Sequence, residues 1–542
     1  MQIKNNQWYR FFLWTAPPLL LILVYVCLGF YYENNDDIAR DYALRAPHNP
    51  ILVFFVWMPL LSKGLRWFYI LAPTFPFYTL LMYILTGGAL YLMASFFAKK
   101  YTEPYEGYWL LGFSFLLFFV GGILENVMYL TYTRVAILTC GMLILKLFFS
   151  ENLSRAQVLL IGVFLLVASL LRVSCLFLSL AILAPVLITR AIREGKGLVI
   201  HSVVLISVML IAIGIQSKES LPEQELNKAI QTIYDYKYIN TEKITDPRDK
   251  LFLEAVYKWF YADPKIINVH ILNELLEKYP IGIIKSGFKD DVVYFVGLVL
   301  RNYFFLLFIN ILLLIYFYRT RSKKEFLLMA IYFLFFYVLI TFISLALKSE
   351  ERVIGPSILL FTFALLVIAD AGLFVKWVVR RRGIVILLLL ILGLTAYKVK
   401  GRVDFNLEMR KKNEATLNVL NDFGKGKVIM ITSLGSHLSF LDPFKYYPVY
   451  MGDTMIRLSG GLSFFSENQK MIKQVAGSDS LLELFEKASA RDNYILIATE
   501  DDINFIGRYF ESFYKKNFGF TPVEEHRFNK ERLKAFVVFR KY

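Results

Sequence analysis

Long uncharged apolar runs recur along most of this 542-residue chain, and they constrain its fold more than any other feature. A helix needs about 20 apolar residues to cross the hydrocarbon core of a bilayer, and several of the runs are that long. The chain is 57% hydrophobic and 19% charged, whereas soluble domains have about 25% charged residues. We therefore predict a polytopic α-helical membrane protein.

The lengths and boundaries of these runs predict about eleven transmembrane helices. Their approximate ranges are 11–32, 76–98, 108–126, 129–149, 156–173, 174–190, 197–215, 293–318, 325–347, 353–375 and 383–398. Met1 to Arg10 leads into a full-length run that lacks a small-residue cleavage site. We therefore expect a retained first helix rather than a signal peptide.

The net charge of +16 is concentrated in short basic clusters between the apolar runs. These clusters are Lys99-Lys100, Arg190/Arg193/Lys196, Arg319/Arg321/Lys323/Lys324 and Lys376/Arg380/Arg381/Arg382. If the N-terminus is cytoplasmic, all of them fall in cytoplasmic loops, as the positive-inside rule predicts, and Lys398/Lys400/Arg402 are an exception. The distribution indicates membrane topology rather than a phosphate-binding stripe, so we expect no nucleic-acid partner.

All three cysteines, Cys27, Cys140 and Cys175, lie within apolar runs. This placement leaves neither a disulfide framework nor a cysteine metal site. Large exterior segments without disulfides suit a bacterial membrane better than an endoplasmic reticulum lumen. We therefore expect a multi-pass protein of the bacterial inner membrane, with its exterior segments in the periplasm.

Three segments are expected on the exterior face, namely residues 33–75, 216–292 and 399–542. The first two are loops of a membrane module that covers residues 1–398. In the third, β-branched runs alternate with helical patterns, which predicts a soluble exterior α/β domain. Its expected strands are 428–432, 494–499 and 535–539, and its expected helices are 479–490 and 501–515.

The first exterior loop opens with Glu33-Asn34-Asn35-Asp36-Asp37, directly after the first apolar run. The two asparagines can cap a short helix that runs through Arg45, until Pro47 and Pro50 break it. Residues 51–69 are rich in aromatic and aliphatic side chains but are interrupted by proline and basic residues. For that stretch we predict a helix lying in the membrane interface.

Two interpretations of Asp36 and Asp37 remain open from the residues alone. Carboxylates in the first turn of a helix are stabilised by the helix dipole, and this is a common structural use. A carboxylate at the membrane interface can also act as a general base, since low dielectric and a neighbouring carboxylate raise its pKa. The two interpretations are compatible, because a residue in the first turn can also act as a base.

The order of these features resembles the GT-C superfamily of membrane glycosyltransferases. One transmembrane helix precedes an acidic pair and two short interfacial helices, and the string Tyr31 to Ile38 is similar to the Asn-Asp-Asp form of bacterial members. The string Pro73 to Tyr78 fits the same pattern. The resemblance implies a GT-C-like helical core, a polyprenyl-phosphate or polyprenyl-diphosphate sugar as donor, and Asp36 or Asp37 as catalytic base.

A donor phosphate on the exterior face needs cations. The candidates are Arg352, Arg172, Arg301, Arg134 and Lys348, all of which lie at or near the expected exterior ends of helices. For Arg134 and Arg301 the alternative is snorkelling of the guanidinium to the interface. For Arg352 it is an ion pair with Glu350 or Glu351, and Glu125 is expected to be able to pair with Arg134.

The remaining polar residues of the first loop, Glu33, Asp41 and His48, are candidates for acceptor binding or positioning. Together with Asp36 and Asp37 they could also hold a divalent cation, although carboxylates crowded on one helical turn are more often solvated. The metal requirement is left open at this point.

These inferences predict a transferase that moves a hexose or pentose from a polyprenyl-linked donor to a glycan, lipid or protein acceptor at the exterior membrane face. One alternative is a polysaccharide polymerase or ligase of the O-antigen type, which normally lacks an acidic pair in its first loop. Another is a lipid or polysaccharide transporter. Transporters usually contain paired halves and helices broken at the midplane, and the sequence shows no such pairing.

Overall fold

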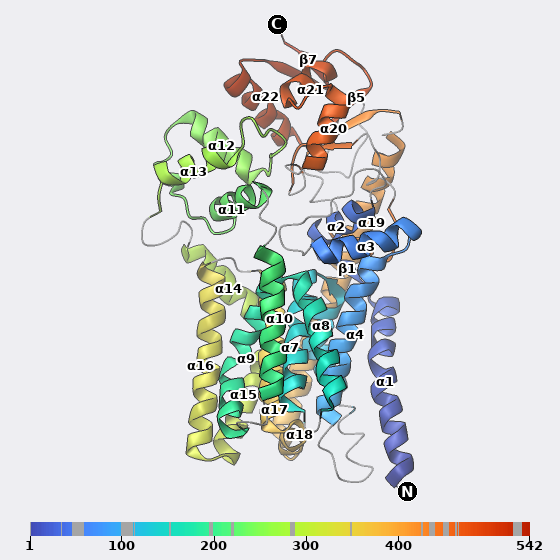
Figure 1. The fold of residues 1–542 in the computed structure, drawn as a ribbon, viewed down its shortest axis with the longest axis vertical. Coiled ribbons are helices and arrows are strands. Elements are labelled where there is room, and N and C mark those ends of the chain that lie inside the picture. Colours follow the sequence, from blue (N-terminus) through green and yellow to red (C-terminus); the bar gives the residue numbers. More distant parts are fainter. Residues whose placement is uncertain are drawn as a thin grey trace.

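The protein consists of a bundle of long helices with smaller elements gathered at one end (Figure 1). The structure is a computed structural model, and it describes residues 2–33, 35–45, 59–98, 112, 114–150, 153–194, 199–217, 222–281, 288–346, 350–423, 426–432, 439–447, 455–460, 463, 466–523 and 534–541. The N-terminus lies at the end of the bundle opposite to these smaller elements, and the C-terminus lies beyond them.

The bundle is built from apolar helices that follow the predicted runs. They are α1 (Gln2–Cys27), α4 (Phe77–Ala98), η1 (Phe119–Ile123), α6 (Leu124–Met128), α7 (Tyr132–Phe149), α8 (Arg155–Leu171), α9 (Val173–Glu194), α10 (Val199–Ser217), α14 (Phe288–Asn302), α15 (Phe304–Thr320), α16 (Lys323–Ala346), α17 (Glu351–Ala369), α18 (Ala371–Val379) and α19 (Arg382–Phe423).

Within the described residues, six helices are long and apolar enough to cross a membrane, or seven if the bent pair α14–α15 is one span. Four shorter apolar helices lie in α1, η1–α6, α8 and α10. Each predicted run overlaps one of these helices or pairs, so the chain is a multi-pass helical membrane protein. The total of eleven spans stays a prediction.

The boundaries differ from the predicted runs at three places. Run 293–318 bends by 80° between α14 and α15, where the Tyr303 hydroxyl donates to the carbonyl oxygen of Glu351 at 3.2 Å. Run 353–375 breaks at Asp370, which has a φ of 64° and caps α18 by accepting a hydrogen bond from Leu373 N. Run 383–398 continues without a break to Phe423.

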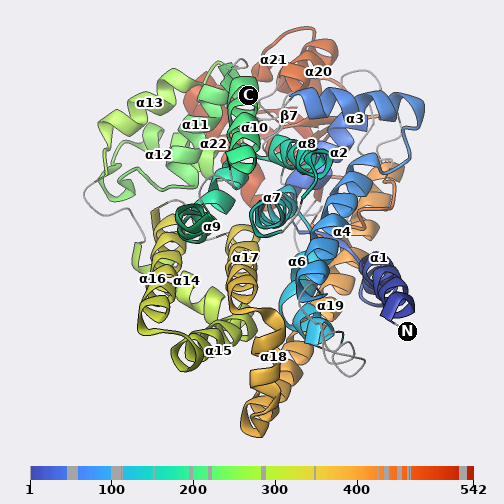
Figure 2. The same cartoon turned by 60° about the horizontal axis from the view of Figure 1, so that its bottom comes forward.

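Helix α7 lies at the centre of the bundle, surrounded by α4, α8, α9 and α17 (Figure 2). Nearly every residue of α7 is buried, because the helix is apolar on all sides apart from Arg134, Lys146 in its last turn and a few hydroxyl groups. Gly141 permits the close approach of α17, since a Cβ atom at this position would collide with the Leu360 side chain.

Short elements cover the C-terminal end of α1 and the N-terminal end of α4. Strand β1 (Tyr31–Tyr32) pairs in parallel with β2 (Tyr129–Leu130), and helices α2 (Asn35–Arg45) and α3 (Pro59–Leu71) follow. Helix α2 confirms the predicted short helix through Arg45, with Asp36 and Asp37 in its first turn. The predicted cap involves Asn34, which lies outside the described residues. Helix α3 covers the second part of the predicted interfacial helix and exposes Trp67, Ile70 and Leu71, whereas residues 51–58 are outside the described part.

The second predicted loop contains short helices joined by turns, as the sequence predicts. They are α11 (Pro222–Tyr234), η3 (Thr241–Lys243), α12 (Pro247–Tyr257) and α13 (Val269–Lys278). This group packs on the C-terminal elements. Asp263 accepts hydrogen bonds from the hydroxyls of Tyr509 at 3.0 Å and Tyr514 at 2.6 Å, and Phe260 packs edge-on against Phe505.

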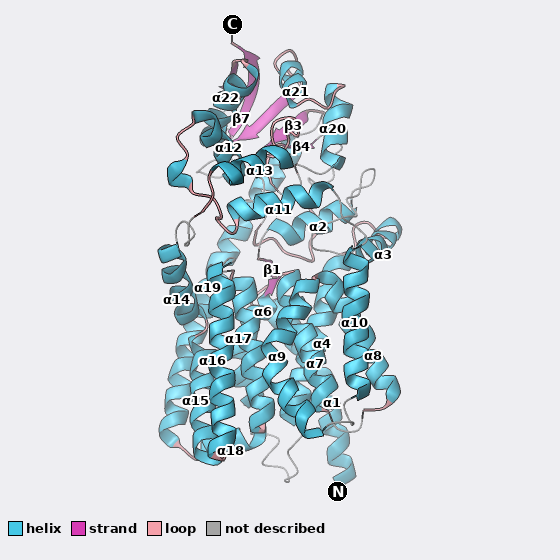
Figure 3. Ribbon diagram, turned by 60° about the vertical axis from the view of Figure 1, so that its left-hand side comes forward, coloured by secondary structure: helices cyan, strands magenta, loops and turns pink. Residues whose placement is uncertain are grey.

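The C-terminal segment contains a five-stranded mixed sheet with helices beside it (Figure 3). Its spatial order is β4 (Met455–Arg457), β3 (Val428–Ile431), β5 (Tyr494–Ala498), β7 (Lys534–Arg540) and β6 (Phe518–Pro522). Strands β4, β3 and β5 are parallel to one another, and β7 runs antiparallel to both of its neighbours, β5 and β6. The helices are α20 (Ser466–Ala476), α21 (Leu481–Ala488) and α22 (Glu500–Tyr514). The three predicted strands correspond to β3, β5 and β7.

The C-terminal segment also contacts the bundle directly. The backbone of Tyr32 in β1 exchanges hydrogen bonds with Leu441 at 3.0 Å and Phe440 at 2.7 Å. The Thr79 hydroxyl of α4 donates to the carbonyl oxygen of Pro443 at 2.7 Å. Residues 439–443 therefore extend the small β1–β2 contact beside the start of α2.

The close contact of α7 and α17 gives a first testable prediction. Replacing Gly141 by Val should lower the thermal stability of the purified protein by about 1–3 kcal/mol, because the added atoms overlap Leu360. Thermal unfolding in detergent measures the change. Gly393→Val in α19 is the matched control, since a Cβ at Gly393 meets no atom within 4 Å. Equal stability of both variants would contradict this packing.

Candidate functional site

The two adjacent carboxylates of α2 occupy different environments. Asp36 lies on the outer side of the helix, and its side chain is 43% exposed. Asp37 is fully buried beside Tyr78 and Tyr132. The difference follows from helix geometry, because neighbouring residues on a helix point about 100° apart. Only Asp36 is open to an incoming molecule.

Asp37 is held by two donors. Its Oδ1 accepts from the Tyr78 hydroxyl and from the backbone N–H of Tyr132, the latter at 3.0 Å. Its Oδ2 is buried and has no hydrogen-bond partner among the described residues. Burial raises the pKa of Asp37 to about 6, although the Arg40 guanidinium and both donors lower it. Its carboxyl group therefore titrates near physiological pH.

Arg352, at the start of α17, faces Asp36. Its Nη1 lies 3.0 Å from Asp36 Oδ2, and its Nε lies 3.8 Å from Glu350 Oε2. The predicted alternative pairing with Glu350 is thus present, but the closer partner is Asp36. The structure brings together two residues that are separated by 316 positions in the sequence.

Two more arginines face the ring of Tyr132, at the start of α7. The Arg40 guanidinium carbon lies 3.9 Å from the ring centroid, and that of Arg172 lies 5.7 Å from it. Arg172 terminates α8 and donates to the hydroxyls of Thr133 and Ser174, each at 3.0 Å. The arginines around Asp36 and Tyr132 form a group that we call the arginine cluster: Arg40, Arg172 and Arg352.

Arg40 was not among the residues predicted from the sequence. It lies four residues after Asp36 and three after Asp37, a spacing that places the side chains on one face of a helix. Burial lowers the pKa of Arg40, but Tyr132, Asp36 and Asp37 beside it raise the pKa by more. The spacing alone could have indicated this arginine.

Arg134 lies next to the cluster but is engaged elsewhere. Its Nε and Nη2 donate to the two carboxylate oxygens of Glu33 at 2.8 and 2.5 Å, and its Nη1 donates to Asn126 at 2.9 Å. Arg134 is 1% exposed. All three guanidinium nitrogens of Arg134 therefore donate hydrogen bonds within the protein. Glu33, which the sequence analysis assigned to acceptor positioning, binds Arg134 instead.

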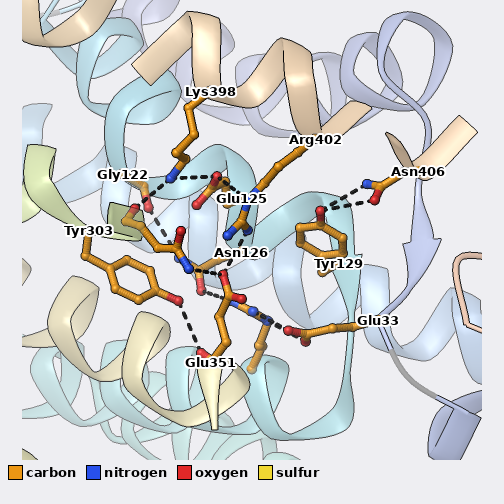
Figure 4. A network of polar contacts seen from close by, with 12 residues as sticks. Glu33, Gly122, Glu125, Asn126, Tyr129, Tyr303, Glu351, Lys398, Arg402 and Asn406 are labelled. Atoms are coloured by element: carbon orange, nitrogen blue, oxygen red, sulfur yellow. Dashed lines mark hydrogen bonds and ion pairs between the residues drawn. The ribbon is translucent and has the colours of Figure 1, made fainter. Parts of the chain in front are cut away.

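A second set of charges, each partly buried, links α6, α17 and α19 (Figure 4). Lys398 Nζ lies 2.8 Å from Glu125 Oε1, and Arg402 Nη1 lies 2.8 Å from Glu351 Oε1. Arg402 Nε also reaches Glu125, at 3.5 Å. The expected pairing of Glu125 with Arg134 is not what the structure shows, because the long helix α19 presents two cations to Glu125.

These contacts explain the exception to the positive-inside pattern. Lys398 and Arg402, which the predicted topology places outside, neutralise the carboxylates of Glu125 and Glu351. The two carboxylates would otherwise lie partly buried without a counter-charge, which is costly.

Other predicted site residues lie outside the cluster. Asp41 pairs with Arg45 at 2.6 Å and accepts from the hydroxyls of Tyr69 and Tyr32, so its carboxylate is occupied. Arg301 is exposed on the last turn of α14 and has no hydrogen bond or ion pair within the described residues. His48 and Lys348 are not among the residues that the structure describes.

The residues present do not fit a resident divalent cation. In the described part of the chain, no group of three or more histidine, cysteine, aspartate or glutamate side chains could hold a metal ion. Asp36 is paired with Arg352, Asp37 is buried, and the surrounding arginines repel a cation. A hard cation needs several converging oxygens instead. The arrangement suits an anion.

No protein-family model and no curated protein matches the sequence. Two crystal structures of ArnT from Cupriavidus metallidurans are similar to the chain, each at 10% identity with a TM-score of 0.40. The structure bound to undecaprenyl phosphate aligns over 96% of this chain and 97% of that chain, and the apo structure over 98% of both. Because the TM-score is so low, we draw the functional proposal from the residues of this chain.

The buried position of Asp37 predicts a pH dependence of stability. Its pKa rises from 3.8 in the unfolded chain to about 6 in the folded protein, so between these values the folded state binds more protons. Stability should therefore fall as pH rises from about 4 to 6. Thermal unfolding at a series of pH values should show a flatter profile for Asp37→Asn over this range. An unchanged pH profile in Asp37→Asn would contradict the shifted pKa.

The Arg134–Glu33 pair predicts a large structural effect. Arg134→Met should destabilise the protein by roughly 3–5 kcal/mol, because it leaves a carboxylate in low dielectric without its partner. The double variant Glu33→Gln/Arg134→Met should regain part of this loss. Arg319→Met, at an exposed position, is the control. Additive effects of the two substitutions in chemical denaturation would show that the pair is not energetically coupled.

Proposed function

We propose that the protein is a membrane glycosyltransferase that transfers a sugar from a polyprenyl-phosphate donor to an acceptor hydroxyl. The observation that carries this proposal is the half-exposed Asp36 carboxylate 3.0 Å from Arg352, with Arg40 and Arg172 on the adjacent Tyr132 ring. The proposal thus assigns the roles of general base and phosphate-binding cations to side chains that lie near one another. They lie where the apolar helices meet the polar elements.

In this proposal Asp36 is the base, and Asp37 is a positioning residue. Asp36 is exposed enough to reach an acceptor hydroxyl, whereas Asp37 is buried under Tyr78. The carboxylate of Asp36 takes the hydroxyl proton as the acceptor oxygen bonds to the anomeric carbon of the donor. The bond from that carbon to the phosphate oxygen breaks, and the polyprenyl phosphate leaves with the electron pair. Attack opposite to the leaving group inverts the anomeric configuration.

The arginine cluster is proposed to bind the donor phosphate. Guanidinium groups suit phosphate oxygens because their N–H donors form bidentate contacts and remain charged at all relevant pH values. Arg352 is expected to change partners when the donor binds, since its Nη1 contacts Asp36 in the present structure. Contact with phosphate would then release the Asp36 carboxylate for the acceptor. Stabilising charge on the leaving phosphate is the main catalytic contribution expected of this cluster.

The same proposal includes the position in the cell. The basic loops indicate a cytoplasmic face at the end of the bundle away from α2. The active site, the α11–α13 group and the C-terminal α/β segment would then face the periplasm from the bacterial inner membrane. The polyprenyl chain would lie along the apolar helices, and the acceptor would approach from the polar side.

The proposal is tested by transfer assays on the purified protein with radiolabelled polyprenyl-phosphate sugars and membrane extracts as the source of acceptor. Asp36→Asn should lower kcat by about 10²–10⁴-fold, because general-base catalysis is lost. Arg352→Ala should raise the KM for the donor and lower kcat, and Arg352→Lys should retain part of the activity. Asp37→Asn should have a smaller effect than Asp36→Asn, since an amide oxygen can still accept from Tyr78.

Two exposed positions provide matched controls. Asp404→Asn on α19 and Arg319→Ala at the opposite end of the bundle change the same side-chain types away from the site. Both should transfer sugar at the wild-type rate. Wild-type activity in Asp36→Asn, with normal folding by gel filtration, would overturn the assignment of the base. Unchanged donor KM in variants of all three cluster arginines would overturn the donor site.

A further inference from the structure

Aromatic side chains gather on the α11–α13 group at the ends of α11 and α12. The ring centroids of Tyr234 and Trp259 are 4.8 Å apart, and those of Tyr234 and Tyr257 are 5.8 Å apart. Tyr236 and Tyr238 form a second pair at 6.1 Å. We call these five residues the aromatic platform. Tyr257 and Tyr238 are 41% and 38% exposed, so the platform reaches the surface.

The backbone beneath the platform adopts an unusual conformation at two positions. Lys237 and Trp259 both have a φ of 54°, in the left-handed region that usually requires glycine at a helix end. The carbonyl oxygen of Trp259 accepts from Gly460 N at 2.8 Å, which fixes this turn to the C-terminal segment. A bulky residue in this region is strained, and such strain is concentrated at functional sites.

The segment that carries Tyr236 and Tyr238 contacts the end of α16 at Ala346, six positions before Arg352 in the sequence. Burial and Asp235 raise the pKa of Tyr236, and the charge of Arg172 lowers it, which places Tyr236 within electrostatic reach of Arg172. The segment crosses the exterior ends of two bundle helices, since Lys237 pairs with Asp291 of α14 at 2.9 Å and the Tyr238 hydroxyl donates to Ala346 of α16 at 3.1 Å. The platform therefore lies on the polar side of the candidate site.

The chemistry of the platform favours a carbohydrate over a lipid or a charged peptide. Tyrosine and tryptophan offer apolar ring faces together with polar donors, which suits the C–H faces and hydroxyls of a pyranose. By contrast, the exposed surface of α3 combines aliphatic side chains such as Leu60, Ile70 and Leu71 with aromatic ones, as expected for contact with lipid. Lys237, the cation within the platform, is already paired with Asp291.

We propose that the aromatic platform binds a glycan acceptor and delivers its hydroxyl to Asp36. The assignment of the bound glycan as the acceptor rests on the proposed function. Of the glycan, lipid and protein acceptors considered from the sequence, this inference selects the glycan. Sugar rings would stack on Tyr236, Tyr238 and Tyr257, with Tyr234 and Trp259 supporting them from behind.

Binding is tested with the full-length protein in lipid nanodiscs and without any donor, by saturation-transfer NMR and isothermal titration. The probes are maltohexaose and chitohexaose. The comparison ligands are a serine- and threonine-rich hexapeptide and phosphatidylglycerol. Tyr257→Ala and Tyr236→Ala should each weaken hexasaccharide binding about 5–10-fold, as expected for loss of one stacked ring. Tyr236→Phe should bind like the wild type, and Tyr318→Ala, an exposed tyrosine at the opposite end of the bundle, is the control.

The possible outcomes distinguish a failure of the proposed glycan-binding platform from a failure of the proposed transferase activity. Hexasaccharide binding that is lost in the ring variants supports the platform even if no sugar transfer is found, in which case only the proposed function fails. Normal hexasaccharide binding in Tyr257→Ala and Tyr236→Ala overturns the platform. Binding of the peptide or the phospholipid alone, or of none of the probes, overturns it as well. In transfer assays the ring variants should raise the KM for a glycan acceptor while the KM for the donor stays unchanged.

Discussion

The arrangement of the candidate site depends on how the bundle neutralises carboxylates that it partly buries. Glu33, three residues before Asp36, is held by Arg134 from α7, and Glu351, directly before Arg352, is held by Arg402 from α19. A charge in a low-dielectric interior must be paired, so neither segment can move without separating its pair. The separation of Asp36 and Arg352 is therefore set by helices that contribute neither residue.

Much of the bundle could be predicted from the sequence because its determinants are local. Length and hydropathy of each run suffice to locate a helix, and the Asn-Asp string suffices to locate the start of α2. The bend at Tyr303 and the break at Asp370 were not predictable in this way. The bend coincides with a hydrogen bond from Tyr303 to the start of α17. At the break, Asp370 has a positive φ, and its side chain caps the following helix, α18. The extension of α19 was missed because its second half is polar, although it remains helical.

The candidate site was predictable in part, because some of its determinants are also local in the sequence. Residue type and proximity to a helix end suffice to nominate Asp36, Asp37, Arg172 and Arg352, but not the partner of each side chain. Arg134 and Glu125 illustrate the limit, since both are engaged by residues that are distant in sequence and that only helix packing brings near. The difference between Asp36 and Asp37 likewise depends on Tyr78 and Tyr132, from two other helices.

Helix α19 has a mechanical consequence. Its 42 residues form one unbroken rod of about 63 Å, roughly twice the hydrocarbon thickness of a bilayer. The rod leads into the C-terminal sheet at one end, and near its middle Lys398 and Arg402 contact the bundle. Asn406, which bonds Tyr129, and Arg410, which bonds the Phe30 carbonyl, extend this attachment along the helix. If the rod tilted about these contacts, its two ends would move in opposite directions. A tilt of a few degrees within the bilayer would displace the C-terminal segment by several ångströms, and with it the α11–α13 group packed against it.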